Sequence, residues 1–364
     1  MVVVIAVAVI ILLAGLAENM LHRRNLKKIP LRILVNGTRG KTTVTRMAIA
    51  VLNEAGIRTM GKTTGSEARR IFPDGREEEY RQERRPVNMI EQLPFLRMAV
   101  KEKVQAIVVE CMAQRPENQR VLARQLIRPH FVLMTNAYVD HIEEIGATEE
   151  ETVAVLAQSI TDECAVITED SRFSAYTNRL LMSQRQVDTT PYQGCNFPIH
   201  EENLRLVAEL ARQLNIDEDT FRRGILKTHP DIGMFKEVML AGCRIRNAFA
   251  ANDPNSFRNV LEETSREGPY ALIYNHRSDR SYRLEAFAQV LRTCSHPPTE
   301  IGVIGDAREW CAKYLRRVTG IAAIAVTQPI SYAKEHPNLL CAGNIKGDGR
   351  MFLQEAIKEA YNDV

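Results

Sequence analysis

The chain lacks the features that mark disulfide-bonded, zinc-binding and nucleic-acid-binding proteins. Its seven cysteines are widely spread and form no CxxC pair, which argues against a disulfide framework or a structural zinc site and favours a reducing compartment. The net charge is only +3, and the arginine-rich stretches are interleaved with acidic residues, so no nucleic-acid-binding surface is predicted. With 364 residues, 45% hydrophobic and 26% charged, the chain is long enough for two α/β domains.

Long apolar runs are absent except at the N-terminus. The run from Val2 to Ala17 carries no charge, and basic residues follow it at 22–24 and 27–28. This length suits a short membrane-spanning helix. Because the basic cluster lies on the C-terminal side of the run, the helix is predicted to be a retained, single-pass anchor with the rest of the chain in the cytoplasm. A cleaved signal peptide is the alternative, since Gly15-Leu16-Ala17 resembles a cleavage site.

A glycine-containing turn followed by lysine and threonine is the most informative motif. Residues 35–46 read VNGTRGKTTVTR, between an apolar segment, 31–35, and a helical pattern. Two glycines let the backbone N–H groups and the helix N-terminus point at phosphate, while Lys41 is predicted to reach the outer phosphates and Thr42 a Mg²⁺ ion. The general P-loop pattern has four residues between its glycines, whereas this chain has two. The predicted nucleotide contacts in this turn are Asn36, Gly37, Thr38, Arg39, Gly40, Lys41, Thr42 and Thr43.

Strand-like and helical patterns alternate after this turn, which predicts an α/β fold with a mostly parallel sheet. The charged segment 69–85 has no periodicity and is predicted to be an exposed loop. A second alternating set begins at Cys243, so a smaller α/β domain is predicted with its boundary near 228–242. The expected strands are 57–60, 104–109, 131–134 and 165–168 in the first domain, and 244–248, 271–274, 300–304, 322–326 and 339–342 in the second.

Polar side chains follow two of the predicted strands. Glu110 ends the apolar run AIVV, where an acid at the carboxyl edge of a sheet can bind Mg²⁺ beside the phosphate turn. Asn136 follows the next strand and is predicted to orient a substrate or phosphate, while Asp140 or His141 would help to hold a second cation. For Glu110 taken alone, a solvated carboxylate at a strand end is the competing interpretation.

The GxxGKTT turn, Glu110 and the spacing Asn136-x-x-x-Asp140-His141 together resemble the central ATPase domain of the Mur ligase and folylpolyglutamate synthetase superfamily. The resemblance implies that Lys41 contacts phosphate, that Thr42 and Glu110 bind one Mg²⁺, and that His141 belongs to a second Mg²⁺ site. It also implies amide-bond formation: ATP phosphorylates a carboxylate, an amine attacks the acyl phosphate, and ADP and phosphate leave. Two cations and a lysine would neutralise the charge on the transferred phosphoryl group.

Further motifs are spread over nearly the whole chain: Gly61-Lys62-Thr63-Thr64-Gly65, Glu110-Cys111-Met112-Ala113, Ala250-Ala251-Asn252-Asp253, Asn275-x-Arg277-x-Asp279-Arg280 and Gly343-Asn344-x-x-Gly347. With the N-terminal anchor, they resemble the poly-gamma-glutamate synthase subunit family of the CapB/PgsB type. That resemblance implies glutamate and a poly-gamma-glutamate chain as substrates. It also implies a small integral-membrane partner of the CapC type and a capsule-assembly component.

One departure from the Mur ligases concerns the second metal site. Many Mur enzymes support this cation with a carbamylated lysine, but residues 104–226 contain no lysine. Another group or water would have to complete the shell.

Candidate substrate residues lie in both domains. Arg277 and Arg280, with Asp279 between them, follow a predicted strand, and the arginines are predicted to clamp carboxylates; ordinary surface arginines are the alternative. Asn252 and Asp253 follow the first strand of the second domain and are predicted to position the amine or the nucleotide. As a helix cap before Pro254, Asp253 would have an equally good structural role.

Lys62, Thr63 and Thr64 follow a short strand of the first domain and are predicted to contact the acyl phosphate or glutamate. No Ser-His-Asp or Cys-His nucleophile pattern emerges from the spacings.

The leading hypothesis is therefore an ATP-dependent ligase that extends poly-gamma-glutamate at the cytoplasmic face of the cell membrane. The predicted parts are an anchor helix (1–22), a Mur-like ATPase domain (23–235) and a smaller Rossmann-like ligase domain (236–364). Another Mur-like amino-acid ligase, or a nucleotide-driven export ATPase or scaffold, is the alternative. Whether the chain forms a homo-oligomer stays open.

Overall fold

The structure is a computed structural model that describes residues 2–64, 68–80, 89–139, 145–146, 148–183, 186–192, 199–229, 231–232, 235, 237–249, 254–278 and 282–362. Six predicted site residues lie outside this set: Asp140, His141, Asn252, Asp253, Asp279 and Arg280. The chain forms two compact units, which meet in the sequence near residue 230.

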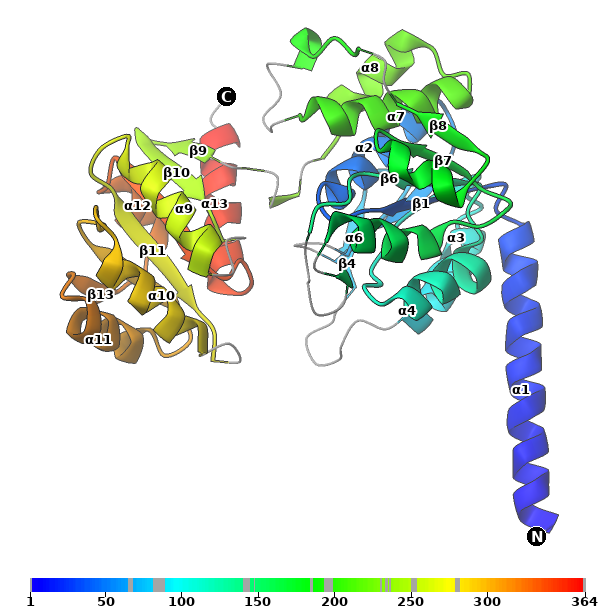
Figure 1. The fold of residues 1–364 in the computed structure, drawn as a ribbon, viewed down its shortest axis with the longest axis horizontal. Coiled ribbons are helices and arrows are strands. Elements are labelled where there is room, and N and C mark those ends of the chain that lie inside the picture. The colour runs from blue at the N-terminus through cyan, green and yellow to red at the C-terminus, as the bar shows by residue number, and fades with distance from the viewer. Residues whose placement is uncertain are drawn as a thin grey trace. The chain divides into compact units, whose positions relative to one another are not determined.

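The first unit is built on an eight-stranded sheet with the strand order β4-β3-β2-β5-β1-β6-β7-β8 (Figure 1). Its neighbouring strands are parallel except for the β2–β3 and β3–β4 pairs. The strands are β1 (Leu31–Asn36), β2 (Thr59–Lys62), β3 (Arg69–Ile71), β4 (Glu77–Glu79), β5 (Ala106–Glu110), β6 (Phe131–Met134), β7 (Ala165–Thr168) and β8 (Leu180–Met182). Because β5, β1 and β6 are parallel neighbours, their carboxyl ends lie together at one edge.

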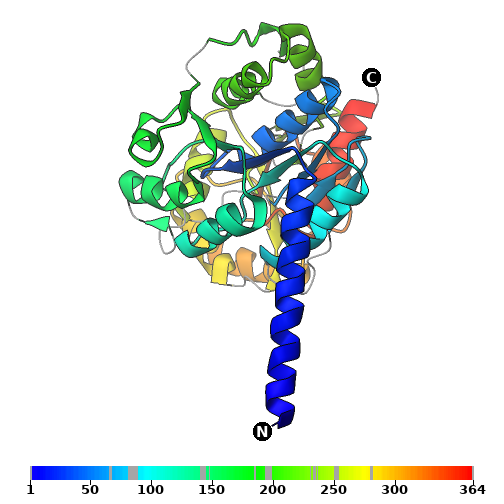
Figure 2. The same ribbon diagram turned by 90° about the vertical axis from the view of Figure 1, so that its right-hand side faces the viewer.

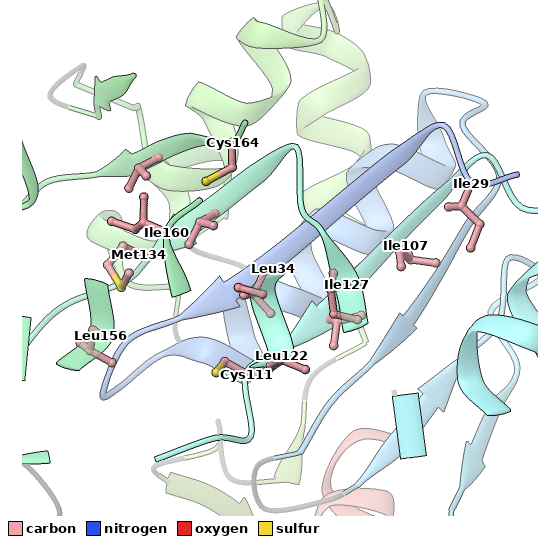
Figure 3. Close-up of a cluster of buried hydrophobic side chains, with 14 of the residues drawn as sticks. Ile29, Leu34, Ile107, Cys111, Leu122, Ile127, Met134, Leu156, Ile160 and Cys164 are labelled. Atoms are coloured by element: carbon pink, nitrogen blue, oxygen red, sulfur yellow. The ribbon is translucent and has the colours of Figure 1, made fainter. Parts of the chain in front are cut away.

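Helices cover both faces of this sheet. On one face, Leu34 of β1 packs in a cluster with residues of α3, η2 and α6. Figure 3 shows Leu34 in this cluster with Leu122 and Ile127 of η2 and Leu156 of α6. On the other, its neighbour Ile33 packs with α2, α7 and α8, because successive side chains of a strand point to opposite faces. The helices are α2 (Lys41–Glu54), α3 (Gln92–Lys101), α4 (Pro116–Val121), the π-helix η2 (Leu122–Ile127), α6 (Glu149–Leu156), α7 (Glu201–Gln213) and α8 (Glu218–Leu226), with short 3₁₀ segments η1 (Met89–Glu91), η3 (Ala157–Ser159), η4 (Ser171–Tyr176) and η5 (Thr190–Tyr192).

The N-terminal helix α1 (Val2–Lys27) extends away from the first unit (Figures 1 and 2). Its apolar residues from Val2 to Leu21 are exposed, and His22, Asn25 and Leu26 near its C-terminal end are the buried ones. A helix of 26 residues with these apolar residues is long enough to cross a membrane.

The second unit has a six-stranded sheet with the order β13-β12-β11-β14-β10-β9, in which only the β9–β10 pair is antiparallel. Residues of α9, α10 and α11 form its main apolar cluster with β11, β12 and β14. The strands are β9 (Glu237–Leu240), β10 (Cys243–Asn247), β11 (Ala271–His276), β12 (Ile301–Gly305), β13 (Ala323–Ala325) and β14 (Asn338–Gly343). The helices are α9 (Pro254–Ser265), α10 (Tyr282–Thr293), α11 (Arg308–Thr319), α12 (Pro329–Lys334) and α13 (Asp348–Asn362).

The predicted α/β class and mostly parallel sheets are confirmed, but the prediction of an exposed loop at 69–85 is wrong for its described part. Residues 69–71 and 77–79 form the antiparallel hairpin β3–β4 at the edge of the sheet. The reason lies in tertiary contacts. Arg46, buried on α2, donates to both carboxylate oxygens of Glu77, at 2.6 and 3.0 Å. The charge of Glu77 contributed to the prediction of an exposed loop, but in the structure it attaches the hairpin to α2.

Candidate functional site

The turn between β1 and α2 has the backbone of a phosphate-binding loop. Gly37 and Gly40 have φ angles of 128° and 82°, in the region that favours glycine. A Cβ atom on Gly37 would lie 2.1 Å from Thr135 Oγ1, and one on Gly40 2.6 Å from Asn203 Oδ1. No side chain caps the N-terminus of α2, so the N–H groups of its first turn can bind an anion.

Asn36 holds the start of this loop through a buried amide network. Its Oδ1 accepts from the Gly37 N–H at 2.8 Å, and its Nδ2 donates to Gln119 Oε1 at 2.8 Å and to Ser159 Oγ at 2.9 Å. Gln119 Nε2 in turn donates to the carbonyl oxygen of Gln114 at 3.2 Å. All three side chains are buried. Asn36 thus positions the loop from inside the protein, and Gln119 and Ser159 support it through hydrogen bonds that the sequence motifs did not indicate.

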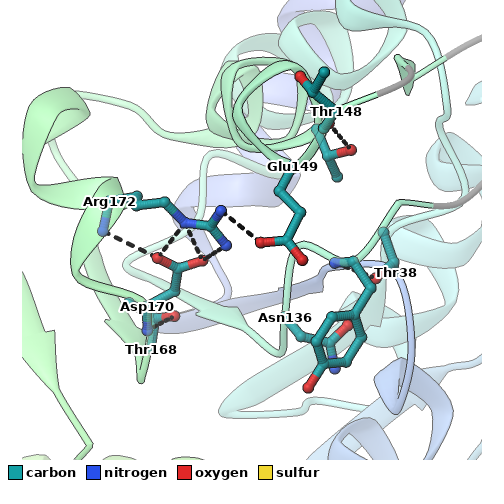
Figure 4. A network of polar contacts seen from close by, with 9 residues as sticks. Thr38, Asn136, Thr148, Glu149, Thr168, Asp170 and Arg172 are labelled. Carbon is teal, nitrogen blue, oxygen red and sulfur yellow. Dashed lines mark hydrogen bonds and ion pairs between the residues drawn. The ribbon is translucent and has the colours of Figure 1, made fainter.

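Asn136 holds the middle of the loop. Its Oδ1 accepts from Thr38 Oγ1 at 2.7 Å and from the Arg39 N–H at 2.9 Å, and its Nδ2 donates to the Arg39 carbonyl oxygen at 3.1 Å. Figure 4 shows Asn136 beside Thr38. The same figure shows Arg172 joining Asp170, after β7, to Glu149 at the start of α6. The structure therefore gives Asn136 a role in shaping the loop.

Lys41 lies over the loop that precedes it. Its Nζ donates to the carbonyl oxygens of Gly37 at 2.7 Å and Thr38 at 3.2 Å. The ammonium group is thus held at the loop, where a phosphate would meet it.

Thr42 and Glu110 meet at the start of α2. Thr42 Oγ1 lies 3.2 Å and 3.1 Å from the two carboxylate oxygens of Glu110, and the Thr64 N–H donates to Glu110 Oε2 at 2.8 Å. Glu110 is 2% exposed. A hydroxyl and a carboxylate beside a phosphate-binding loop are oxygen ligands of the kind that Mg²⁺ takes, with phosphates and water completing the shell. These two residues therefore fit a divalent cation.

No cluster of three or more His, Cys, Asp or Glu side chains suited to a metal occurs among the described residues.

A cavity of about 210 Å³ opens beside these groups. Lys41, Thr64 and Glu110 line its polar side, and Met112, Ala113 and Leu156 its apolar side. Cys111 also lines it, but burial raises the pKa of its thiol to about 11, so a thiolate nucleophile is disfavoured.

Lys62 lies at the carboxyl end of β2 and is only 1% exposed. Its Nζ donates to Glu91 Oε2 at 3.2 Å and lies 4.6 Å from the centre of the Tyr80 ring, while the Tyr80 hydroxyl donates to the Thr63 carbonyl at 2.8 Å. Burial lowers the pKa of the Lys62 ammonium to about 8. Of the three predicted residues, Thr64 lines the cavity. The Thr63 carbonyl accepts from Tyr80, and Lys62 contacts Glu91 and the Tyr80 ring.

In the second unit, polar groups gather at the carboxyl ends of β11, β12 and β14. Asn275 Nδ2 donates to the carbonyl oxygens of Asn344 and Lys346, the latter at 2.8 Å, and Arg277 Nη1 lies 3.5 Å from Asn344 Oδ1. The Ser278 N–H donates to Asp306 at 2.9 Å, and this bond lowers the pKa of that carboxyl. Arg277 therefore lies among polar groups at the carboxyl ends of these strands, which does not favour the alternative of an ordinary surface arginine.

The structure thus brings Asn36–Thr43, Thr64, Glu110 and Asn136 to one edge of the first sheet, and it places Arg277 at the corresponding edge of the second. Sequence reasoning missed Gln119, Ser159, Asn203 and Tyr80. Their contacts join segments that are far apart in the sequence, so no local pattern indicated them.

Comparisons with known proteins agree with this architecture. The Mur ligase middle domain family matches residues 35–251, and the poly-gamma-glutamate synthase CapB C-terminal domain family matches residues 240–359. PGA synthase CapB of Bacillus subtilis (strain 168) is 31% identical over 303 residues, which cover 78% of this chain and 77% of that protein. Capsule biosynthesis protein CapB of Bacillus anthracis is 31% identical over 300 residues, which cover 77% of this chain and 64% of that protein.

Solved structures share the fold at low identity. E. coli FolC in complex with ADP has a TM-score of 0.62 and 14% identity, covering 93% of this chain and 91% of that chain. The Yersinia pestis folylpolyglutamate synthase/dihydrofolate synthase complexed with AMPPNP and Mn has a TM-score of 0.61 and 14% identity, covering 95% and 92%. On the family matches and the identity to a CapB protein, this chain belongs to the poly-gamma-glutamate synthase CapB family, within the Mur ligase superfamily of ATP-dependent amide ligases.

Proposed function

We propose that this ligase extends a poly-gamma-glutamate chain by one glutamate for each ATP. A carboxylate oxygen of the chain end attacks the γ-phosphorus of ATP, the bond from that phosphorus to the bridging oxygen breaks, and ADP leaves. The neutral amine of glutamate then attacks the acyl carbon, loses a proton, and displaces phosphate as the amide forms. Both products of ATP, ADP and phosphate, are thereby accounted for.

One observation carries this proposal: Lys41 and Glu110 line the same cavity, and the Thr42 hydroxyl lies within 3.2 Å of the Glu110 carboxylate. Lys41 is proposed to move from its loop carbonyls to the transferred phosphoryl group and to stabilise the charge that develops there. Asn36 and Asn136 keep the loop N–H groups aligned toward the phosphates, as their hydrogen bonds support.

A divalent cation held by Thr42 and Glu110 would supply charge neutralisation at the phosphates. We propose two Mg²⁺ ions in the working enzyme, with His141 at the second. His141 lies outside the described residues, and the lysine-free span 104–226 means that water or another side chain would complete that shell.

Glutamate is proposed as the incoming amino acid. Arg277, placed among polar groups at the strand edge of the second unit, would hold one of its carboxylates. Arg280 is a second candidate for holding a carboxylate, and Asp279 is a further substrate candidate. Asn252 and Asp253 are proposed to position the attacking amine or the nucleotide.

We further propose that α1 anchors the enzyme in the cell membrane with its catalytic parts in the cytoplasm, divided into 1–22, 23–235 and 236–364. The exposed apolar helix and the basic residues that follow it support this placement. An integral-membrane CapC-type subunit and a capsule-assembly component are the proposed partners.

The proposal is tested by incubating membranes that carry this chain with ATP and labelled glutamate. ADP and phosphate should form in proportion to label in an acid polymer. AMP and pyrophosphate would exclude the acyl-phosphate mechanism, and ADP formation without any amide product would point instead to a transport ATPase.

Lys41→Ala should reduce glutamate-dependent ADP formation by at least about a thousandfold, because it removes the cation at the transferred phosphoryl group. Lys313→Ala, on α11 of the second unit, is the matched control and should retain turnover. The thermal transition of both variants should stay near that of the parent. Substantial turnover by Lys41→Ala would refute the site assignment.

A further inference from the structure

The anchor helix α1 is docked to the first unit and not loosely tethered to it. His22 Nε2 hydrogen-bonds the carbonyl oxygen of Gln125 at 3.1 Å. Arg32, on β1, donates to the carbonyl oxygens of Leu26 at 3.1 Å and Ile29 at 2.8 Å, and also to those of residues 127 and 128 at the end of η2. These bonds fix the point at which α1 leaves the first unit.

Helix α3 lies beside α1 at the level where the apolar run ends. Arg97 of α3 forms an ion pair with Glu18 at 2.7 Å, and Glu18 is the first charged residue after the run 2–17. At about 1.5 Å per residue, Glu18 lies about 6 Å from His22 along the helix. Since the headgroup layer of a bilayer is about 5 to 8 Å thick on each side, Arg97 would lie within it.

A surface hollow of about 380 Å³ opens on this side of α3. Pro94, Arg97, Met98 and Lys101 line it from one face of the helix, at the spacing 3, 4 and 7, and Phe72 lines it from the loop after β3. The opposite face of α3, with Phe95 and Leu96, packs in the core. Arg76, Glu78 and Glu102 also line the hollow, so its wall combines three cations and two carboxylates with apolar side chains. Of these apolar side chains, Met98 also packs against the core cluster.

The two acidic residues that line the hollow, Glu78 and Glu102, are each paired with an arginine. Glu102 bonds Arg58 at 3.4 Å, and Glu78 bonds Arg76 at 2.6 Å. In the part of the chain that the structure describes, Lys101 forms no ion pair, and neither do Lys27 and Lys28 at the end of the anchor. The surface beside α1 thus carries unpaired positive charge where phosphates of lipid headgroups lie.

We propose that this hollow holds an anionic phospholipid of the cytoplasmic leaflet, with the lipid phosphate at Lys101 and Arg97 and the glycerol and first acyl carbons against Met98 and Pro94. The inference rests on the membrane anchoring proposed above, because only an inserted α1 brings the hollow to the headgroup layer. It does not depend on the substrate of the ligase.

The test uses the full chain in phosphatidylcholine vesicles that contain a photoactivatable phosphatidylglycerol, with photoactivatable phosphatidylcholine as the second probe. Labelling should map to peptides of α3 and should favour phosphatidylglycerol about fivefold or more. Lys101→Ala should lower that labelling about fivefold, and Lys101→Glu further. Lys313→Ala, an exposed helix lysine in the second unit, is the matched control and should leave it unchanged.

The outcomes separate the two proposals. Equal labelling by both lipids, or equal labelling of the parent and Lys101→Glu in vesicles, would overturn the lipid site while leaving the anchor intact. A chain that does not insert into vesicles would overturn the anchor and, with it, this inference. Loss of labelling in the presence of free glycerol phosphate would indicate a site for soluble phosphates and would overturn the lipid site. If the hollow holds a lipid, this competitor should leave the labelling unchanged.

Discussion

At the scale of single residues, the phosphate loop depends on buried amides behind it as much as on its own sequence. Asn36 is 2% exposed and satisfies its side chain with Gly37, Gln119 and Ser159. Gln119 also reaches Gln114, on a different wall of the same cavity. Gln119 therefore links Asn36 to Gln114, and both of these residues line the cavity. Its removal should weaken nucleotide binding by loosening the phosphate loop.

Gln119→Leu should raise the KM for ATP about tenfold, because a buried hydrogen bond to the loop is lost and such bonds contribute about 1 to 3 kcal/mol. The kcat should change less, since the side chain is not proposed to touch the transferred group. Steady-state kinetics and titration with a fluorescent ADP analogue measure the two effects. Gln158→Leu changes a partly exposed side chain on η3, next to Ser159 in the sequence, and is the control. Equal effects of the two changes would argue against a positioning role.

Lys62 gives a prediction about pH. Burial lowers the pKa of Lys62 in the folded chain to about 8, from the ordinary value of 10.5, so the unfolded chain binds more protons than the folded chain between these values. The penalty for the buried charge is present below pH 8 and is relieved as the pH rises to 10.5. The stability of the parent relative to Lys62→Met should therefore increase by about 3 kcal/mol across that window. Urea unfolding at pH 7.5 and pH 10 tests this, and a constant difference would contradict it.

At the scale of elements, the β3–β4 hairpin is attached to the helix that follows the phosphate loop. Arg46 of α2 binds both carboxylate oxygens of Glu77 and also donates to the His229 carbonyl at 3.1 Å, just before the sequence passes to the second unit. Arg46 is buried and Glu77 partly exposed. Three separate segments of the first unit thus share one guanidinium group.

Arg46→Met should destabilise the first unit by about 3 kcal/mol, since removing one partner of a buried ion pair leaves the other charge without compensation. Trypsin should then cut faster after Arg69, Arg70 or Arg76, because the hairpin loses its attachment. Arg212→Met, which removes an exposed pair with Glu209 on α7, should change neither measurement beyond a few tenths of a kcal/mol. An unaltered cleavage rate in Arg46→Met would show that other contacts hold the hairpin.

At the scale of the whole molecule, the chain joins an exposed apolar helix to a well-packed first unit through few residues. Only His22, Asn25 and Leu26 of α1 are buried, and the Arg32 bonds begin at Leu26. Most of α1 can therefore be removed without exposing the core of the unit.

Deletion of residues 2–21 should release the chain from membranes into the soluble fraction and leave its thermal transition within a few degrees of the parent. Centrifugation of cell lysates and calorimetry measure these effects. A truncated chain that stays with the membrane would show that other surfaces or partners hold it there, and one that fails to fold would contradict the limited role assigned to α1 in packing.

Much of the fold was predictable because its signals are local. Apolar runs ended by polar residues indicated β1, β5, β6 and β7, and strand-turn-helix spacing indicated the phosphate loop. The hairpin β3–β4 and the edge strands β8 and β9 were missed. These strands are only three or four residues long, which is too short for a reliable period-2 pattern, and pairing with neighbouring strands determines them.

The sequence by itself determined the chemistry of the loop, because Gly37, Gly40, Lys41 and Thr42 are neighbours whose roles follow from one turn of backbone. Glu110 could also be predicted from the sequence, because it is an acid at the end of an apolar strand. Only the tertiary structure decided what holds these groups in place. Thr64, Gln119 and Ser159 reach the site because the sheet order sets β2, β5, β1 and β6 side by side, and contacts between distant segments leave no local pattern in a single sequence.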